Sequence, residues 1–291
     1  MTSDTDAAVK ALVDVLDLEV IDDDLFRGHS QDYGRGRSFG GQVAGQALMA
    51  GMRSVPEEFF VHSMHSYFLL PGDPTGSIVY DVERIRDGRS FLTRRIVARQ
   101  HGRAIFYMTA NFHKDEEGFE HQDAMPDVLP PERGLDLLKR MRERTDVEGQ
   151  RLAQEWAAIE GRAVGHSLGG GLEDDPAHPS RQRIWMRISG TLPDDPQIHL
   201  AAFTWASDIS LLGAALAAHT LDHGSAQMAS LDHTIWFHRP FRADEWLLYD
   251  QSSPSAQGGR GLALGRVFTQ DGRLVATVAQ EGLIRPRRDE H

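Results

Sequence analysis

Three polar side chains in the second half of the chain have types that suit one hydrolytic reaction. They are Asp208 in WASDISLL, Ser230 in MASLDH and Gln280 in LVATVAQEG. A carboxylate can accept a proton from water, while a hydroxyl and an amide can hold both the water and the carboxylate. This set suits general-base hydrolysis without a covalent intermediate.

Each of the three also has a plain structural explanation. Asp208 would cap a helix that the sequence predicts to begin there, because Ser and Asp are favoured at helix starts. The Ser230 hydroxyl could satisfy a neighbouring backbone group, and Gln280 could end its strand in solvent. A comparison of the two halves of the chain favours chemistry over these explanations.

The two halves of the chain are copies of one unit. GGQVAGQALMAGM (40–52) aligns with DISLLGAALAAHT (208–220). With a small further drift, HGRAIFYMTANF (101–112) aligns with DGRLVATVAQEG (271–282). Because the matching blocks follow in the same order, we interpret them as a duplication, and repeats of this kind decide the fold.

Each copy reads as a short strand, a helix and several strands separated by turn signals such as PGDPTG and TQDGR. We therefore predict an α+β fold with two tandem repeats, each an antiparallel sheet wrapped around a central helix. The N-terminal repeat spans 1–115 and the C-terminal repeat, which carries the polar set, spans 181–291. The charged stretch 116–180 is expected to be a connection that carries helix, because residues 132–161 have helical spacing.

The two copies differ at the three polar positions. The first copy has Gly40, His62 and Ala110 where the second has the carboxylate, the hydroxyl and the amide. We predict that the polar set meets where the start of the second helix reaches the sheet, with the free N–H groups of that helix start placed to hold an oxyanion. We also predict that Ser230 and Asp232 share one face of their strand, because strand side chains alternate.

The composition narrows the classes of protein and partner. The chain has 291 residues, no cysteine and a net charge of −12. Without cysteine there is no disulfide, thiolate metal site or cysteine nucleophile. The acidic balance argues against a nucleic-acid partner, which would need a basic surface. No apolar run is long enough to span a membrane and the start lacks a signal-peptide pattern, so we expect no membrane partner and a cytoplasmic protein.

Four stretches of the sequence resemble the type II acyl-CoA thioesterases, the bacterial TesB group. They are SFGGQVAGQALMAG, WASD, SLDHTIWFHRPFRADEWLLYD and VAQEGLIR, and the resemblance covers nearly the whole chain. It implies a double hotdog fold and the hydrolysis of fatty acyl-CoA to free fatty acid and coenzyme A, with no cofactor. It implies that Asp208, Ser230 and Gln280 are the catalytic residues that position and activate water. It also implies a homo-oligomer of double hotdogs.

Two glycines, Gly40 and Gly41, begin the first helix after GRGRSF. This stretch lacks the lysine and the Ser/Thr of a P-loop, and close packing explains glycines at such a place. Backbone contact with coenzyme A or the substrate carbonyl is the functional alternative, so both glycines are substrate-binding candidates together with Asp232. The sequence does not determine which acyl chain length the protein prefers. It also does not determine which arginines bind the coenzyme A phosphates; the candidates are Arg84, Arg86, Arg89, Arg260 and Arg266.

Two motifs suggest other chemistry. GHSLG (165–169) matches the G-x-S-x-G nucleophile elbow around Ser167, but no strand–turn–helix pattern surrounds it. His62 and His65 are three residues apart in a strand and so face opposite ways, which gives no reason to expect a metal site. His233 stays open as a general base, although it is expected to point away from Ser230.

Two other functions stay open on the same fold. A hotdog enoyl-CoA hydratase pairs an Asp with a His a few residues later, whereas here His219 stands far along the predicted helix. A non-catalytic acyl-CoA binding protein would have little use for the polar set.

Overall fold

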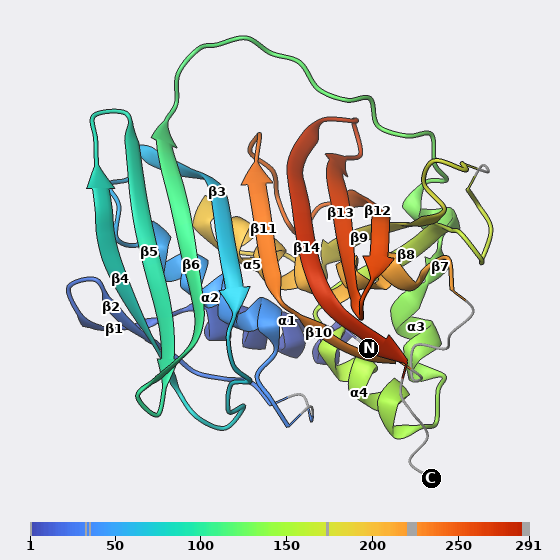
Figure 1. The fold of residues 1–291 in the computed structure, drawn as a ribbon, viewed down its shortest axis with the longest axis horizontal. Helices are drawn as coiled ribbons and strands as arrows, with labels where there is room; N and C mark the ends of the chain where they lie inside the picture. Colours follow the sequence, from blue (N-terminus) through green and yellow to red (C-terminus); the bar gives the residue numbers. More distant parts are fainter. Residues whose placement is uncertain (1, 33, 35, 173–174, 220–225, 287–291) are drawn as a thin grey trace.

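One continuous antiparallel sheet runs through the whole molecule, which we describe from a computed structural model (Figure 1). The structure describes residues 2–32, 34, 36–172, 175–219 and 226–286. The sheet has 14 strands, in the order β1-β2-β4-β5-β6-β3-β11-β14-β13-β12-β9-β8-β7, and β10 pairs with β14. The main hydrophobic core lies between the sheet and the helices that it curls around.

The first half of the chain forms one half of the sheet and its helices. Its elements are α1 (Thr2–Leu16), β1 (Glu19–Asp22), β2 (Leu25–Gly28), α2 (Gly40–Met52), β3 (Phe59–Phe68), β4 (Ile78–Asp87), β5 (Phe91–Gln100) and β6 (Arg103–Lys114). Helix α2 is buried along almost its whole length, as expected for the central helix of a repeat.

The second half of the chain forms the other half of the sheet. Its elements are β9 (Ser180–Ile188), α5 (Pro196–Ser210), the 3₁₀ helix η2 (Leu211–Leu216), β10 (Ala226–Ser230), β11 (Asp232–Phe237), β12 (Leu247–Gln257), β13 (Arg260–Thr269) and β14 (Leu274–Pro286). Strands β3 and β11, which the duplication aligns with each other, pair side by side and join the two halves.

Small residues allow the two central helices to pack closely together. A Cβ on Gly41 of α2 would lie 2.2 Å from the carbonyl oxygen of Trp205 on α5, and one on Gly45 would lie 2.9 Å from that of Ala201. Real side chains do not approach backbone oxygens so closely. These glycines therefore set the distance between α2 and α5, behind the central strands in Figure 1.

The second central helix does not begin at Asp208, so that prediction was wrong. Helix α5 begins at Pro196, with Asp195 as N-cap accepting from the backbone N–H of Gln197, which is a favoured helix start. Asp208 lies in the last turn of α5, and the apolar stretch after it forms η2. Polar side chains of β9 bind the backbone there, because Gln182 donates to the Ser210 carbonyl at 2.8 Å.

The connection between the halves carries both helix and strand. It contains the 3₁₀ helix η1 (Pro131–Arg133), β7 (Leu135–Asp136), α3 (Leu137–Arg142), α4 (Val147–Glu155) and β8 (Ile159–His166). The predicted helical stretch is divided because Asp136 and Asp146 each cap a separate short helix. Strand β8 pairs with β9 and extends the sheet, so the connection is more than the helix-bearing link expected from its composition.

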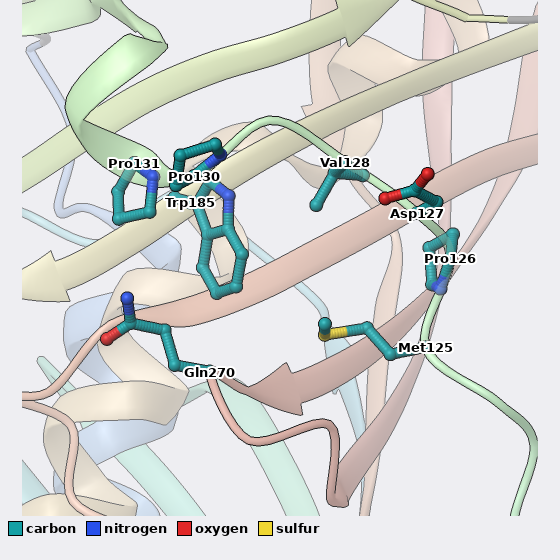
Figure 2. Close-up of a pocket in the computed structure, with 8 residues that line it drawn as sticks. All are labelled: Met125, Pro126, Asp127, Val128, Pro130, Pro131, Trp185 and Gln270. Carbon is teal, nitrogen blue, oxygen red and sulfur yellow. The ribbon is translucent and has the colours of Figure 1, made fainter.

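The start of the connection arches over one end of the sheet and then covers β9 (Figure 1). The indole of Trp185 on β9 donates to the carbonyl of Leu129 at 2.8 Å. Beside this contact lies a hollow of about 400 Å³, lined by residues 125–128, Pro130 and Pro131 together with Trp185 and Gln270 (Figure 2). None of the three predicted catalytic side chains lines it, so it is separate from the site described next.

Candidate active site

The three predicted catalytic side chains form one hydrogen-bonded group. The Gln280 amide nitrogen Nε2 lies 2.6 Å from Asp208 Oδ1 and 2.8 Å from Ser230 Oγ. The Ser230 hydroxyl donates to the same Asp208 oxygen at 3.0 Å. Gln280 is fully buried, whereas the other two are partly exposed. The predicted convergence of these three residues is therefore present in the structure, and their catalytic role stays a prediction.

A one-residue slip in strand register brings Ser230 into this group. Ser230 of β10 lies opposite Gly282 of β14, whereas Thr234 of β11 lies opposite Ala279 of the same strand. The extra residue is Leu231, which separates β10 from β11 and acts as a β-bulge. Ser230 can therefore reach Asp208 on the core side of the sheet.

The same slip turns Asp232 away from the group, so the prediction that Ser230 and Asp232 share one face was wrong. Along β11 the inward residues are buried, and Asp232 alternates with them. Its carboxylate accepts a hydrogen bond from the backbone N–H of Glu281 at 2.6 Å. Burial raises the pKa of Asp232, against the lowering effect of that hydrogen bond. Its role in substrate binding stays a prediction.

The N-terminus of α2, and not that of α5, meets the group. A Cβ built on Gly40 would lie 2.8 Å from Asp208 Oδ2. Phe39 precedes α2 without a side-chain cap, and the first N–H groups of a helix have no partner inside it. Helix N-termini also carry partial positive charge. The helix N-terminus beside the carboxylate is therefore that of α2, because the end of α5 that carries Asp208 presents carbonyl groups. Oxyanion binding by its N–H groups stays a prediction.

His233 lies on the same side of the sheet as Ser230, contrary to the expected orientation. The bulge explains this, because it lets residues three apart face the same way. Its ring is fully buried, and Nε2 lies 2.9 Å from the Ser207 hydroxyl oxygen. Burial lowers the pKa of His233, and the nearby Asp208 carboxylate partly offsets this. Sequence alternation alone could not place this histidine beside the group.

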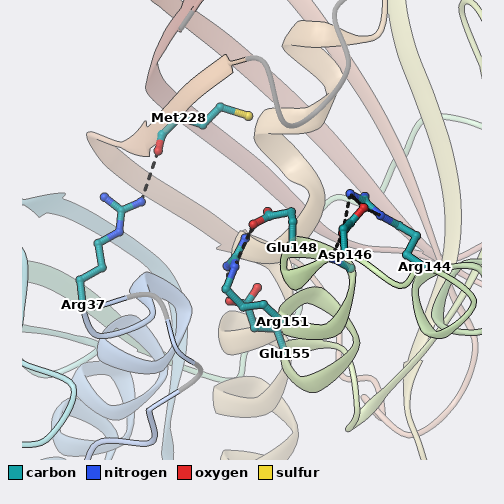
Figure 3. A network of polar contacts seen from close by, with 8 residues as sticks. Arg37, Arg144, Asp146, Glu148, Arg151, Glu155 and Met228 are labelled. Atoms are coloured by element: carbon teal, nitrogen blue, oxygen red, sulfur yellow. Dashed lines mark hydrogen bonds and ion pairs between the residues drawn. The ribbon is translucent and has the colours of Figure 1, made fainter. Parts of the chain in front are cut away.

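The loop before α2 is tied to β10 beside the site. Arg37 donates to the carbonyl of Met228 at 3.3 Å (Figure 3). This contact joins the two repeats close to Ser230, because Met228 stands two residues before it in β10. The contact therefore helps to hold the α2 N-terminus against the strand.

The other motifs serve structural purposes. The Ser167 hydroxyl donates to the Arg181 carbonyl at 3.2 Å and accepts from the Arg181 N–H at 2.7 Å. It follows β8 and precedes β9 without a helix between them, so the nucleophile elbow is not formed. His219 is exposed beyond η2. Within the described ranges, no three His, Cys, Asp or Glu side chains are grouped so as to hold a metal ion.

Comparisons with known proteins show the family to which the chain belongs. A family model described as acyl-CoA thioesterase matches residues 175–283, and one described as acyl-CoA thioesterase N-terminal domain matches 29–113. Acyl-CoA thioesterase 2 of Haemophilus influenzae is 42% identical over 277 residues, which cover 94% of this chain and 96% of that protein. The chain belongs to the acyl-CoA thioesterase family. The predicted resemblance to this family is confirmed.

Further relatives extend the likeness to a mammalian protein and to solved structures. Human acyl-coenzyme A thioesterase 8 is 42% identical over 282 residues, covering 93% of this chain and 88% of the human protein. The crystal structure of the acyl-CoA thioesterase II TesB2 from Mycobacterium marinum superposes with a TM-score of 0.83 at 44% identity, covering 95% of this chain and 98% of that one. The predicted double hotdog fold of the α+β class is confirmed.

Proposed function

We propose that this thioesterase-family chain hydrolyses fatty acyl-CoA to free fatty acid and coenzyme A, with water activated by Asp208. The observation that carries the proposal is the shared oxygen of the polar group. Asp208 Oδ1 accepts from both Ser230 and Gln280, and among the described residues no donor is bonded to Oδ2. Oδ2 is therefore the oxygen left to accept a proton from water.

The reaction that follows from this arrangement is a direct attack by water. Asp208 takes a proton from water while the water oxygen bonds to the thioester carbonyl carbon. The carbonyl oxygen becomes an oxyanion, which the N–H groups at Gly40 and Gly41 would hold. When the oxyanion collapses, the carbon–sulfur bond breaks and the leaving sulfur takes the proton that Asp208 had accepted. Coenzyme A leaves as thiol, the fatty acid carries the new oxygen, and Asp208 is again a carboxylate.

Ser230 and Gln280 hold the base in place in this proposal. The Gln280 amide uses its Nε2 group on both Asp208 and Ser230, so one side chain fixes the other two. Ser230 donates its only hydroxyl hydrogen to the carboxylate and supports the base in this proposal, in which water is the nucleophile. Hydrolysis should then show no burst of an acyl-enzyme.

We also propose that the protein acts in the cytoplasm, in lipid metabolism, as a homo-oligomer of double hotdogs. The absence of cysteine supports a reducing compartment. The outer face of the sheet supports self-association, because Tyr67, Trp236 and Leu264 are large apolar side chains that stand exposed there. Sedimentation of the purified chain would give the size of the assembly.

The test is release of free thiol from acyl-CoAs of short to long chain by wild type and by Asp208→Asn. We expect the variant to lose about 10²- to 10⁴-fold in kcat, the usual contribution of a general base. Asp14→Asn is the matched change outside the group, at an exposed carboxylate of α1 paired with Lys10, and its kcat should stay at the wild-type level. Wild-type activity in Asp208→Asn would move the base elsewhere, and no thiol release from any substrate would end the thioesterase proposal. Hydration of an enoyl-CoA instead would favour the hydratase.

A further inference from the structure

His233 lies beside the polar group of Asp208, Ser230 and Gln280, and one of its ring nitrogens has no hydrogen-bond partner in the part of the chain that the structure describes. Its Nε2 is occupied by the Ser207 hydroxyl, whereas Nδ1 is buried and has no hydrogen-bond partner among the described residues. A buried polar atom without a partner is costly, so native proteins seldom leave one.

Gln280 has the complementary unpaired atom. Its Oε1 is buried and likewise has no hydrogen-bond partner among the residues that the structure describes. The register of β11 and β14 sets Thr234 opposite Ala279, which places His233 across from Gln280 one step further along. The imidazole interacts with the Gln280 side chain.

The chemistry of the polar group decides which way the amide must face. An ionised carboxylate only accepts hydrogen bonds, so the amide must turn its NH₂ toward Asp208 and Ser230. Its carbonyl oxygen then faces His233 and needs a donor. Because burial lowers the pKa of His233, the ring is neutral at pH 7 and carries a single N–H.

The position of that single hydrogen depends on two contacts. The Ser207 hydroxyl lies 3.0 Å from the Thr204 carbonyl oxygen and 2.9 Å from Nε2, and it has one hydrogen for the two. With the imidazole hydrogen on Nε2, Ser207 keeps its bond to Thr204, but a nitrogen lone pair faces the Gln280 oxygen and two buried acceptors meet. With the imidazole hydrogen on Nδ1, the ring donates to Gln280, and the Ser207 hydrogen turns from Thr204 to Nε2. The second arrangement sets no buried side-chain acceptor against another, so we assign the Nδ1–H tautomer.

We propose that His233 is a positioning residue for the hydrolysis proposed above, whose Nδ1–H holds Gln280 Oε1 so that the amide presents Nε2 to Asp208 and Ser230. The inference rests on the proposed function for its effect on rate, but not for its effect on the tautomer. Without this donor the amide can turn over and set its oxygen against the carboxylate. His233 does not touch the substrate in this scheme.

The tautomer can be read directly in the wild-type protein by nitrogen-15 NMR of the imidazole rings. The His233 signals are identified as those missing from His233→Asn, among the 14 histidines of the chain. We expect a protonated Nδ1 and a bare Nε2 near pH 8. A proton on Nε2 alone would overturn the proposal, whatever the protein hydrolyses.

Two variants of equal shape test the effect on rate. Asn places an amide nitrogen where Nδ1 stood, whereas Leu has the same outline without a donor. We expect His233→Leu to lower kcat about 10- to 100-fold with KM little changed, the effect of leaving one buried acceptor unpaired. His233→Asn should recover most of that loss. Equal losses in the two variants, both folded by circular dichroism, would contradict the proposal.

A double-mutant cycle separates positioning from general support of the fold. Gln280→Met keeps the length of the side chain and removes the amide. If His233 acts through Gln280, then adding His233→Leu to Gln280→Met should not lower kcat any further. If His233→Leu lowered kcat by the same factor in wild type and in Gln280→Met, the histidine would act on the structure alone and not through Gln280. If the wild type releases no thiol from any acyl-CoA, the proposed function fails, and the tautomer measurement still decides the geometry.

Discussion

The contact between Gly40 and Asp208 can be tested by adding a single methyl group. In Gly40→Ala, the new Cβ would lie 2.8 Å from Asp208 Oδ2, and 2.9 and 3.2 Å from two ring carbons of Phe68. Real Cβ atoms essentially never come within 3.0 Å of such neighbours, so the carboxylate or the ring must move. The methyl would also crowd Oδ2, the oxygen that accepts the proton in the proposed reaction.

The size of the effect follows from two opposing contributions. Overpacking of this kind costs about 1–3 kcal/mol, whereas Ala in place of Gly in a helix recovers up to about 1 kcal/mol. The free energy of unfolding should therefore fall by about 0–2 kcal/mol. The cost to activity is not offset, because the displaced carboxylate is the proposed base. We expect kcat/KM to fall about 10- to 100-fold, which corresponds to about 1.4–2.8 kcal/mol.

The matched control is Gly51→Ala, near the other end of the same helix. Its Cβ would lie 3.2 Å from the tip of Ile96, a flexible side chain away from the site. The assay is thiol release over a range of acyl-CoA concentrations, with melting curves of both variants. If Gly40→Ala and Gly51→Ala had the same kcat/KM, the reasoning about Oδ2 and the α2 N-terminus would be refuted.

Two further predictions concern the residues around the base. Ser230→Thr should keep most activity because it keeps the hydroxyl that donates to Asp208, whereas Ser230→Ala should lower kcat about tenfold or more. Steady-state kinetics of the two variants would show this difference. A burst of acyl-enzyme in the wild type would instead make Ser230 a nucleophile. The lowered pKa of His233 means that the unfolded chain binds a proton more readily than the folded one. The stability that His233 contributes is therefore fully present above the unfolded pKa of about 6.5 and is lost as pH falls from there toward the folded pKa. Urea unfolding of wild type and His233→Asn across this range should show a shallower pH dependence in the variant. The charges of Asp208 and Asp232 both act to raise the pKa of the ring. Parallel curves for the two proteins would speak against this prediction.

Sequence comparison of the two repeats was enough to select the polar set. Duplicated units share their packing pattern, so a carboxylate, a hydroxyl and an amide confined to one copy stood out against Gly40, His62 and Ala110. Their mutual hydrogen bonds in the structure agree with that choice. The first central helix was also predictable, because its glycines and alanines leave few other roles for a buried segment.

The errors came from features that no local pattern encodes. The second helix was placed too late because Asp208 resembles a cap, while the stronger signal of Asp195 followed by Pro196 lay upstream. Asp232 was placed on the wrong face because alternation holds only within a regular strand. The slip at Leu231 depends on how β10 and β11 each pair with β14.

By itself, the sequence determined the duplication, the α+β class and the identities of Asp208, Ser230 and Gln280. These are properties of composition and periodic pattern, and they can be recognised in the sequence without a structure. Only the tertiary structure decided that the N-terminus of α2 faces the carboxylate and that His233 lies behind the amide. Both facts arise from contacts between segments far apart in the chain, where close packing of the helices and strand register are set together.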